Sequence, residues 1–174
     1  YLGVVTAGQL TVSTQEHDVY FDHLQVGSLT VGSGAYVHVQ TSSAAATLST
    51  SSFPEVYLSG TLALDAHGAT YDRGYNVYLQ DDAASLFFGS GCTIDNLNII
   101  GKQDESGYTN VDIEVQSRSA TVTKMQDLGN LKVALGSLTA KNAVGAVHGE
   151  LLLDNGKLKL GEGADNLMAS DSGA

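Results

Sequence analysis

The chain has 174 residues, of which 43% are hydrophobic and only 16% are charged, and its formal net charge is −11. This composition excludes a disordered chain, and the length suits one domain with a sizeable core. The negative charge argues against nucleic acids and anionic membrane surfaces as partners. No run of about 18 apolar residues occurs, so the sequence predicts no transmembrane helix.

Short triplets in which two apolar residues flank a variable one recur along the chain. A first set comprises Val19-Tyr20-Phe21, Val37-His38-Val39, Val56-Tyr57-Leu58, Val77-Tyr78-Leu79, Leu97-Asn98-Ile99, Val111-Asp112-Ile113, Val133-Ala134-Leu135 and Leu151-Leu152-Leu153. Their first residues are on average about 19 positions apart. Alternation of this kind is typical of a short strand with one buried face.

A second set of triplets is interleaved with the first, and turn-forming Gly, Asp, Asn and Ser residues lie between them. It includes Leu10-Thr11-Val12, Leu29-Thr30-Val31, Leu62-Ala63-Leu64, Leu86-Phe87-Phe88, Leu138-Thr139-Ala140 and Leu158-Lys159-Leu160. Strands this short are stable only when neighbours cover them, and stacked coils provide such cover. The pattern predicts an all-β fold, a β-solenoid with rungs of about 19 residues. A β-sandwich or jelly roll is the alternative, because its strands also recur every 8–12 residues or so.

The predicted solenoid forms one domain over residues 1–160, followed by a glycine-rich and acidic tail, linker or loose cap over residues 161–174. The chain opens without Met, which suggests a mature or excised segment. A solenoid cut from a longer chain leaves open rung edges, so we expect it to be prone to self-association.

Two stretches carry a family resemblance: the segment from Leu24 to Ala35, LQVGSLTVGSGA, and the segment from Gly149 to Gly161, GELLLDNGKLKLG. Both resemble the strand-and-turn repeats of bacterial autotransporter passenger domains. The resemblance implies a right-handed parallel β-helix, export to the bacterial cell surface, and adhesion. Because those passengers share no universal functional residues, it assigns a role to no residue of this chain.

Motifs for catalysis and cofactors are sparse. The sequence contains no Gly-x-Ser-x-Gly elbow and no phosphate-binding loop, and we expect the lone Cys92 to be buried and unreactive. Paired acids on neighbouring rungs can cleave glycosidic bonds, and the candidates are Asp65, Asp72, Asp81 and Asp82, although Asp in turns is ordinary. Asp81-Asp82 and Asp104-Glu105 offer oxygen ligands for Ca²⁺ without a recognised spacing. We therefore assign no cofactor, no metal site and no catalytic residue.

The middle residues of the first triplets suggest a surface worth testing. If the flanking valines point inward, then Tyr20, His38, Tyr57 and Tyr78 point outward. On stacked rungs these rings would form one exposed column, which can stack on sugar faces or anchor a protein partner. In the alternative interpretation the rings only stabilise one another across the strands.

The sequence therefore favours an extracellular or cell-surface structural and adhesive segment that binds a glycan or a cell-surface protein through these four residues. One alternative is a carbohydrate-active enzyme or phage tail spike on the same β-helix. Another is a carbohydrate-binding β-sandwich module. Nucleic-acid binding and membrane insertion are not expected.

Overall fold

The protein is a β-solenoid in a computed structural model, which describes residues 2–41, 53–66, 70–71, 75–81, 84–89, 93–94, 97–105, 107–116, 119–142, 147–160 and 167–170. These residues form nineteen strands and no helix. Across the same ranges no helix is long and apolar enough to span a membrane. The predicted all-β solenoid is thus confirmed, and the sandwich alternative is wrong, because stacked parallel strands build the main sheet.

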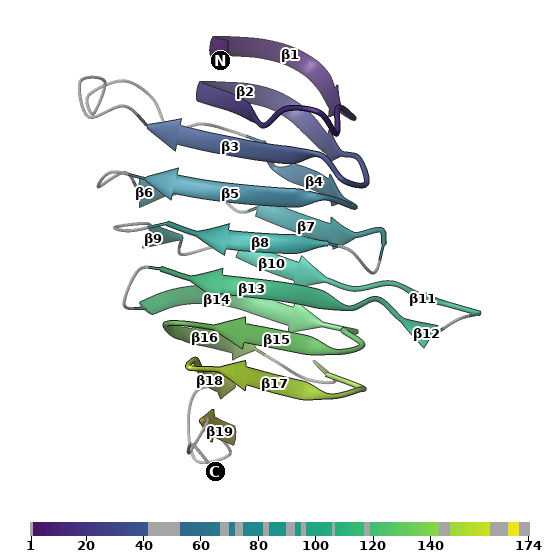
Figure 1. Cartoon of the computed structure of the whole chain (residues 1–174), viewed down its shortest axis with the longest axis vertical. Coiled ribbons are helices and arrows are strands. Elements are labelled where there is room, and N and C mark those ends of the chain that lie inside the picture. Colours follow the sequence, from purple (N-terminus) through teal and green to yellow (C-terminus); the bar gives the residue numbers. More distant parts are fainter. Residues whose placement is uncertain are drawn as a thin grey trace.

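Each coil contributes one strand to a front face and one to a back face (Figure 1). The front strands are β3 (Tyr36–Thr41), β5 (Thr61–Ala66), β8 (Ser85–Phe88), β13 (Val111–Val115), β15 (Leu131–Ala134) and β17 (Leu151–Asp154). The back strands are β4 (Glu55–Leu58), β7 (Tyr75–Leu79), β10 (Leu97–Ile100), β14 (Ser119–Gln126), β16 (Ser137–Asn142) and β18 (Lys157–Leu160). Neighbours within each face pair in parallel.

One long strand joins the two faces at the N-terminal end. The start of β2 (Val19–Val31) pairs with β3 and its end pairs with β4, while β1 (Leu2–Val12) runs parallel to it. Front strands run leftward and back strands rightward as the chain descends in Figure 1, so the coil is right-handed. Short pairs of strands lie at the turns. One is the parallel pair of β6 (Thr70–Tyr71) and β9 (Thr93–Ile94), and another is the antiparallel hairpin of β11 (Gln103–Asp104) and β12 (Gly107–Tyr108).

Inward residues of both faces form one hydrophobic core between the faces. The eight residues predicted to be inward are at most 1% exposed: Val37, Val39, Val56, Leu58, Val77, Leu79, Leu97 and Ile99. Burying an aliphatic side chain stabilises the fold by about 1.5–3 kcal/mol, and here each one is covered by its counterpart on the next coil. The alternation in the sequence therefore predicts correctly which side chains are buried.

The predicted stacking order of these residues is wrong in one respect. Val37 lies on the front face between Val19 and Leu62, whereas Val56 lies on the back face between Leu29 and Val77. The first two and the last three triplets of the first set lie on the front face, whereas the three triplets between them lie on the back face, so the set does not form one continuous column. A second error concerns Leu135, which is 56% exposed with a φ of 72° because the strand ends before it.

Coil length varies because the turns vary. Inward partners on successive coils are 18 to 27 residues apart, about 22 on average along the front face, compared with the predicted 19. The turn between β4 and β5 is only Ser59-Gly60, and a neighbouring coil passes directly over it. A Cβ at Gly60 would overlap the carbonyl oxygens of Gly32 and Ala35 on that coil. Glycine is required at this turn by close approach of the backbones.

The tail partly folds back on the last coil. Residues Leu167–Ser170 form β19, which pairs antiparallel with β18 along the back face. The rest of the predicted tail, including residues 161–166, lies outside the described residues, as does Cys92, so its predicted burial remains a prediction.

Replacing Gly60 with Ala should lower the free energy of unfolding by roughly 1–3 kcal/mol, because the added methyl group forces apart two packed coils. Chemical denaturation followed by circular dichroism measures the change. Gly8→Ala is the matched control: a Cβ there meets nothing within 4 Å, and the variant should be neutral or slightly stabilised. Equal stability of both variants would refute the close packing at this turn.

Candidate functional site

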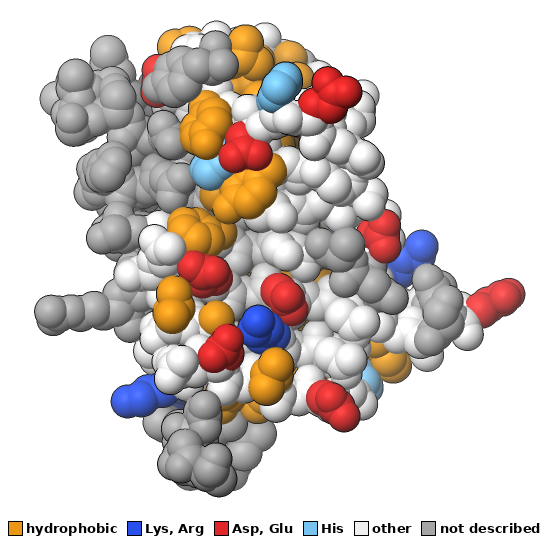
Figure 2. All heavy atoms as spheres, in the orientation of Figure 1, with side chains coloured by type: hydrophobic (Ala, Val, Ile, Leu, Met, Phe, Trp, Pro, Cys, Tyr) orange, Lys and Arg blue, Asp and Glu red, His pale blue; other side chains and the backbone are white. Residues whose placement is uncertain are grey.

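Parallel register lines up the outward residues of the front face in columns that run along the solenoid axis. One column contains Tyr36, Thr61, Ser85, Asp112 and Lys132, and the next contains His38, Ala63, Phe87, Glu114 and Ala134. Figure 2 shows this face: hydrophobic and acidic side chains lie over both its upper and lower parts, with histidines in the upper part and basic side chains in the lower part. Within these two columns the aromatic residues precede the charged residues along the axis.

A shallow hollow of about 240 Å³ lies along these columns. Small side chains leave room for it, since Thr61 and Ser85 follow Tyr36 in one column and both line the hollow. Tyr36 and Phe87 both line the hollow. The hollow thus has aromatic walls at its β3 and β8 levels.

Charged residues line the hollow at the levels of β13 and β15. Asp112 and Glu114 occupy alternate positions of β13 and share its outward side, next to Lys132 on β15. Lys132 is directed to another acid, since its Nζ lies 3.8 Å from Oδ2 of Asp154. Gln116 Nε2 donates a hydrogen bond of 3.1 Å to Oε1 of Glu114. Two carboxylates therefore face the hollow beside one ammonium group, which forms its ion pair with the carboxylate of Asp154.

An aromatic stack borders the hollow at its N-terminal end. The His38 ring lies between Tyr20, at a centroid distance of 4.1 Å, and Tyr36, at 4.5 Å. The His38 side chain is only 14% exposed, and its Nε2 lies 3.6 Å from Oδ2 of Asp18. Stacked rings cover one another's faces, so His38 has no free face, and its role here is to support Tyr36 beside the hollow.

The four predicted ligand-binding residues do not form one column. Tyr20 and His38 pair across β2 and β3 on the front face, whereas Tyr57 and Tyr78 pair across β4 and β7 on the back face. The back pair also stacks, with a centroid distance of 5.4 Å. The prediction of one shared face is wrong, because the triplets that carry these residues lie on different faces of the coil.

Several residues of the hollow were missed from the sequence. Tyr36 lies two positions before His38 on the same strand, and strand alternation places both on one side. Phe87 and Asp112 are the middle residues of their triplets, and Glu114 lies two positions after Asp112 on the same strand, so all three were equally accessible to this logic. What the sequence did not reveal is the register that brings them together.

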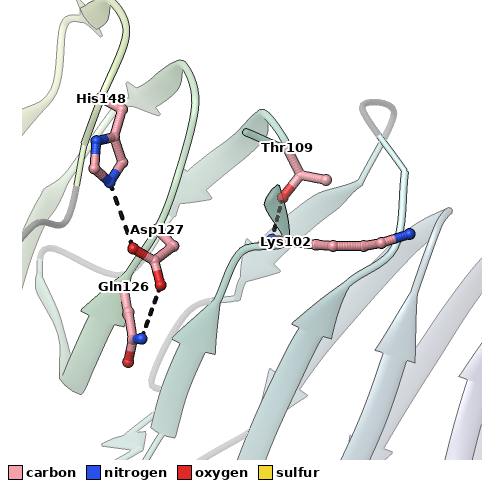
Figure 3. Close-up of polar contacts among 5 residues, drawn as sticks. All are labelled: Lys102, Thr109, Gln126, Asp127 and His148. Carbon is pink, nitrogen blue, oxygen red and sulfur yellow. Dashed lines mark hydrogen bonds and ion pairs between the residues drawn. The ribbon is translucent and has the colours of Figure 1, made fainter. Parts of the chain in front are cut away.

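A second polar cluster lies at the turns near the hairpin of β11 and β12 (Figure 3). His148 stacks on Tyr108 with a centroid distance of 3.8 Å, and its Nε2 lies 3.4 Å from Oδ1 of Asp127. Asp127 also accepts a hydrogen bond of 2.8 Å from Gln126, while the Lys102 amide donates to Oγ1 of Thr109 at the base of the hairpin. The contacts of His148 with Tyr108 and Asp127 cross between coils and hold the turns together, whereas the other two hydrogen bonds are local.

The acids predicted as glycosidase candidates contribute no described site. Asp72 and Asp82 lie outside the described residues, as does the side chain of Asp65. Within the described ranges, no three His, Cys, Asp or Glu side chains are grouped to hold a metal ion.

Comparison with known proteins yields no relative: no protein-family model matches the chain, and neither a curated protein nor a solved structure resembles it significantly.

Tyr57 should ionise at higher pH than an ordinary tyrosine. Its hydroxyl donates a 3.2 Å hydrogen bond to Oε2 of Glu55, and this bond and the carboxylate charge raise the pKa of Tyr57 above 10.0. Any stability that this hydrogen bond contributes is present below the ordinary tyrosine pKa of 10.0, and it is lost as the pH rises through the raised pKa of Tyr57 in the folded state. The measurement is the difference in tyrosinate absorbance between the wild-type protein and Tyr57→Phe as a function of pH, which reports the titration of Tyr57 alone.

In a Glu55→Gln background the same difference titration should shift to lower pH, because the charge that opposed ionisation is gone. Glu150→Gln, at a turn far along the chain, is the control and should leave the titration unchanged. An unshifted Tyr57 titration in Glu55→Gln would contradict the assignment.

Proposed function

We propose that this chain is an extracellular, structural β-solenoid whose front face binds glycans. The observation that carries the proposal is the hollow lined by Tyr36 and Phe87 on one side and by Asp112, Glu114 and Lys132 on the other. Aromatic rings pack against the C–H faces of sugars, and carboxylates accept hydrogen bonds from sugar hydroxyls. The hollow joins both kinds of group on one open surface.

The scaffold supports an adhesive role. Parallel coils hold the hollow on regular strands of one sheet, which position side chains more firmly than loops do. The strand-and-turn resemblance to autotransporter passengers favours the cell surface. A rigid rod with a binding face along its length is well suited to hold a ligand away from a cell.

The test is a glycan array with the purified chain and a Tyr36→Ala/Phe87→Ala variant. Wild-type protein should bind a subset of glycans, and the double variant should lose roughly 1–3 kcal/mol of binding free energy, as is typical of aromatic anchors. Binding constants for the glycans found on the array are then measured by calorimetry.

Tyr57→Ala/Tyr78→Ala is the matched control, because it removes two stacked rings from the opposite face. It should leave glycan affinity unchanged. If the back-face variant lost binding while the front-face variant kept it, the glycan would bind to the back face. If the wild-type chain bound no glycan, the proposal would fail.

A second candidate function is glycoside hydrolysis in the same hollow. Asp112 and Glu114 are two positions apart on β13, which places their Cα atoms roughly 6.6 Å apart. Because both side chains leave the strand on the same side, their carboxyl groups can lie within the roughly 5–9.5 Å at which glycosidases hold such a pair. Incubating bound oligosaccharides with the protein and analysing them for shorter products decides between binding alone and hydrolysis.

A further inference from the structure

We infer that the front-face hollow selects glycans that carry free amino groups, in chains such as β-linked glucosamine. The inference rests on the proposed glycan binding and adds to it the chemical class of the ligand. It follows from the length of the hollow, its charge and its aromatic walls.

The hollow is long and shallow. Its lining reaches from Tyr36 on β3 to Lys132 on β15, across five adjacent strands. Strands in a sheet are about 4.8 Å apart, so the lining covers roughly 19 Å. A volume of about 240 Å³ spread over that length leaves room for a narrow chain rather than for a compact ligand. An extended oligosaccharide lying along the solenoid axis has this shape.

The charge of the hollow selects among such chains. Asp112 and Glu114 line it, and the ion pairs found among the described residues involve neither of them. The one cation in the lining, Lys132, lies 3.8 Å from Asp154 outside it. The lining therefore carries a net negative charge on a chain whose own charge is −11. Uronic and sialic acids are repelled, and ammonium groups are attracted.

The aromatic walls strengthen this preference. An ammonium group near a ring face gains a cation–π attraction, and charge-assisted hydrogen bonds to carboxylates are roughly twice as strong as neutral ones. Tyr36 and Phe87 lie in adjacent columns, on strands that precede β13 along the axis. A chain along the axis thus places one sugar ring against the aromatic residues while amines on the following units reach Asp112 and Glu114.

The experiment compares a glucosamine hexamer, its fully N-acetylated counterpart and an oligogalacturonate of equal length, by calorimetry at mildly acidic pH and low salt. The amine-bearing hexamer should bind at least tenfold more tightly than the acetylated one, and the oligogalacturonate should not bind. Asp112→Asn/Glu114→Gln should abolish the difference between the two hexamers. Added salt should reduce it, as expected for an interaction of charges.

Glu55→Gln/Glu150→Gln is the control, since it changes the net charge equally but away from the hollow. It separates recognition in the hollow from general attraction between a polycation and an acidic protein. The inference would be overturned if the control variant also lost the preference for the amine-bearing hexamer, or if the wild-type protein bound both hexamers equally. Neither outcome would contradict glycan binding itself. Absence of binding by any glycan, acetylated or not, would overturn the proposed function too.

Discussion

The structure depends on parallel pairing of each coil with the next, in register. No single coil has enough residues to bury its own apolar side chains, so every inward residue is covered by its counterpart one coil away. In the last coils the side chains of the turns follow the same rule. Asn110 accepts a hydrogen bond from the Asn130 amide, and Asn130 accepts one from the Glu150 amide, each of 2.7 Å. Core and turns are thus held by one repeated interaction between neighbours.

The same register decides what the outer surface can do. Outward residues of successive coils must lie side by side, so neighbouring rings stack and cover each other's faces, as Tyr57 and Tyr78 do. Stacked rings therefore stabilise the pairing of the coils, and the ring faces that they cover are not open to a ligand. A hollow forms where small residues interrupt a column of large ones, and Thr61 and Ser85 provide that interruption after Tyr36.

Sequence reasoning predicted the fold class and the buried side chains because alternation depends only on local strand geometry. It failed on the assignment of strands to faces, since triplets on the two faces look alike. Val37 and Val56 are 19 residues apart, a spacing that predicts one full coil, yet they lie on opposite faces, half a coil apart. A clearer repeat lies near the C-terminus, where Ile113, Val133 and Leu153 are partners at intervals of 20. Starting from that repeat gives the correct register of the last coils, and with it the pairing of Asp112 with Lys132.

The two ends of the coil are not equivalent, and the direction of the strands explains why. At the C-terminal end, β19 runs antiparallel to β18 and breaks the parallel order, so a further coil on the back face would meet a strand of opposite direction. At the N-terminal end, β1 keeps the parallel order over nine paired residues of β2, and Val4 on it is 72% exposed. A strand of this length offers a regular row of backbone groups to whatever pairs with it next. The parallel order of the back face can therefore be extended at β1, and at its other end it stops at β19.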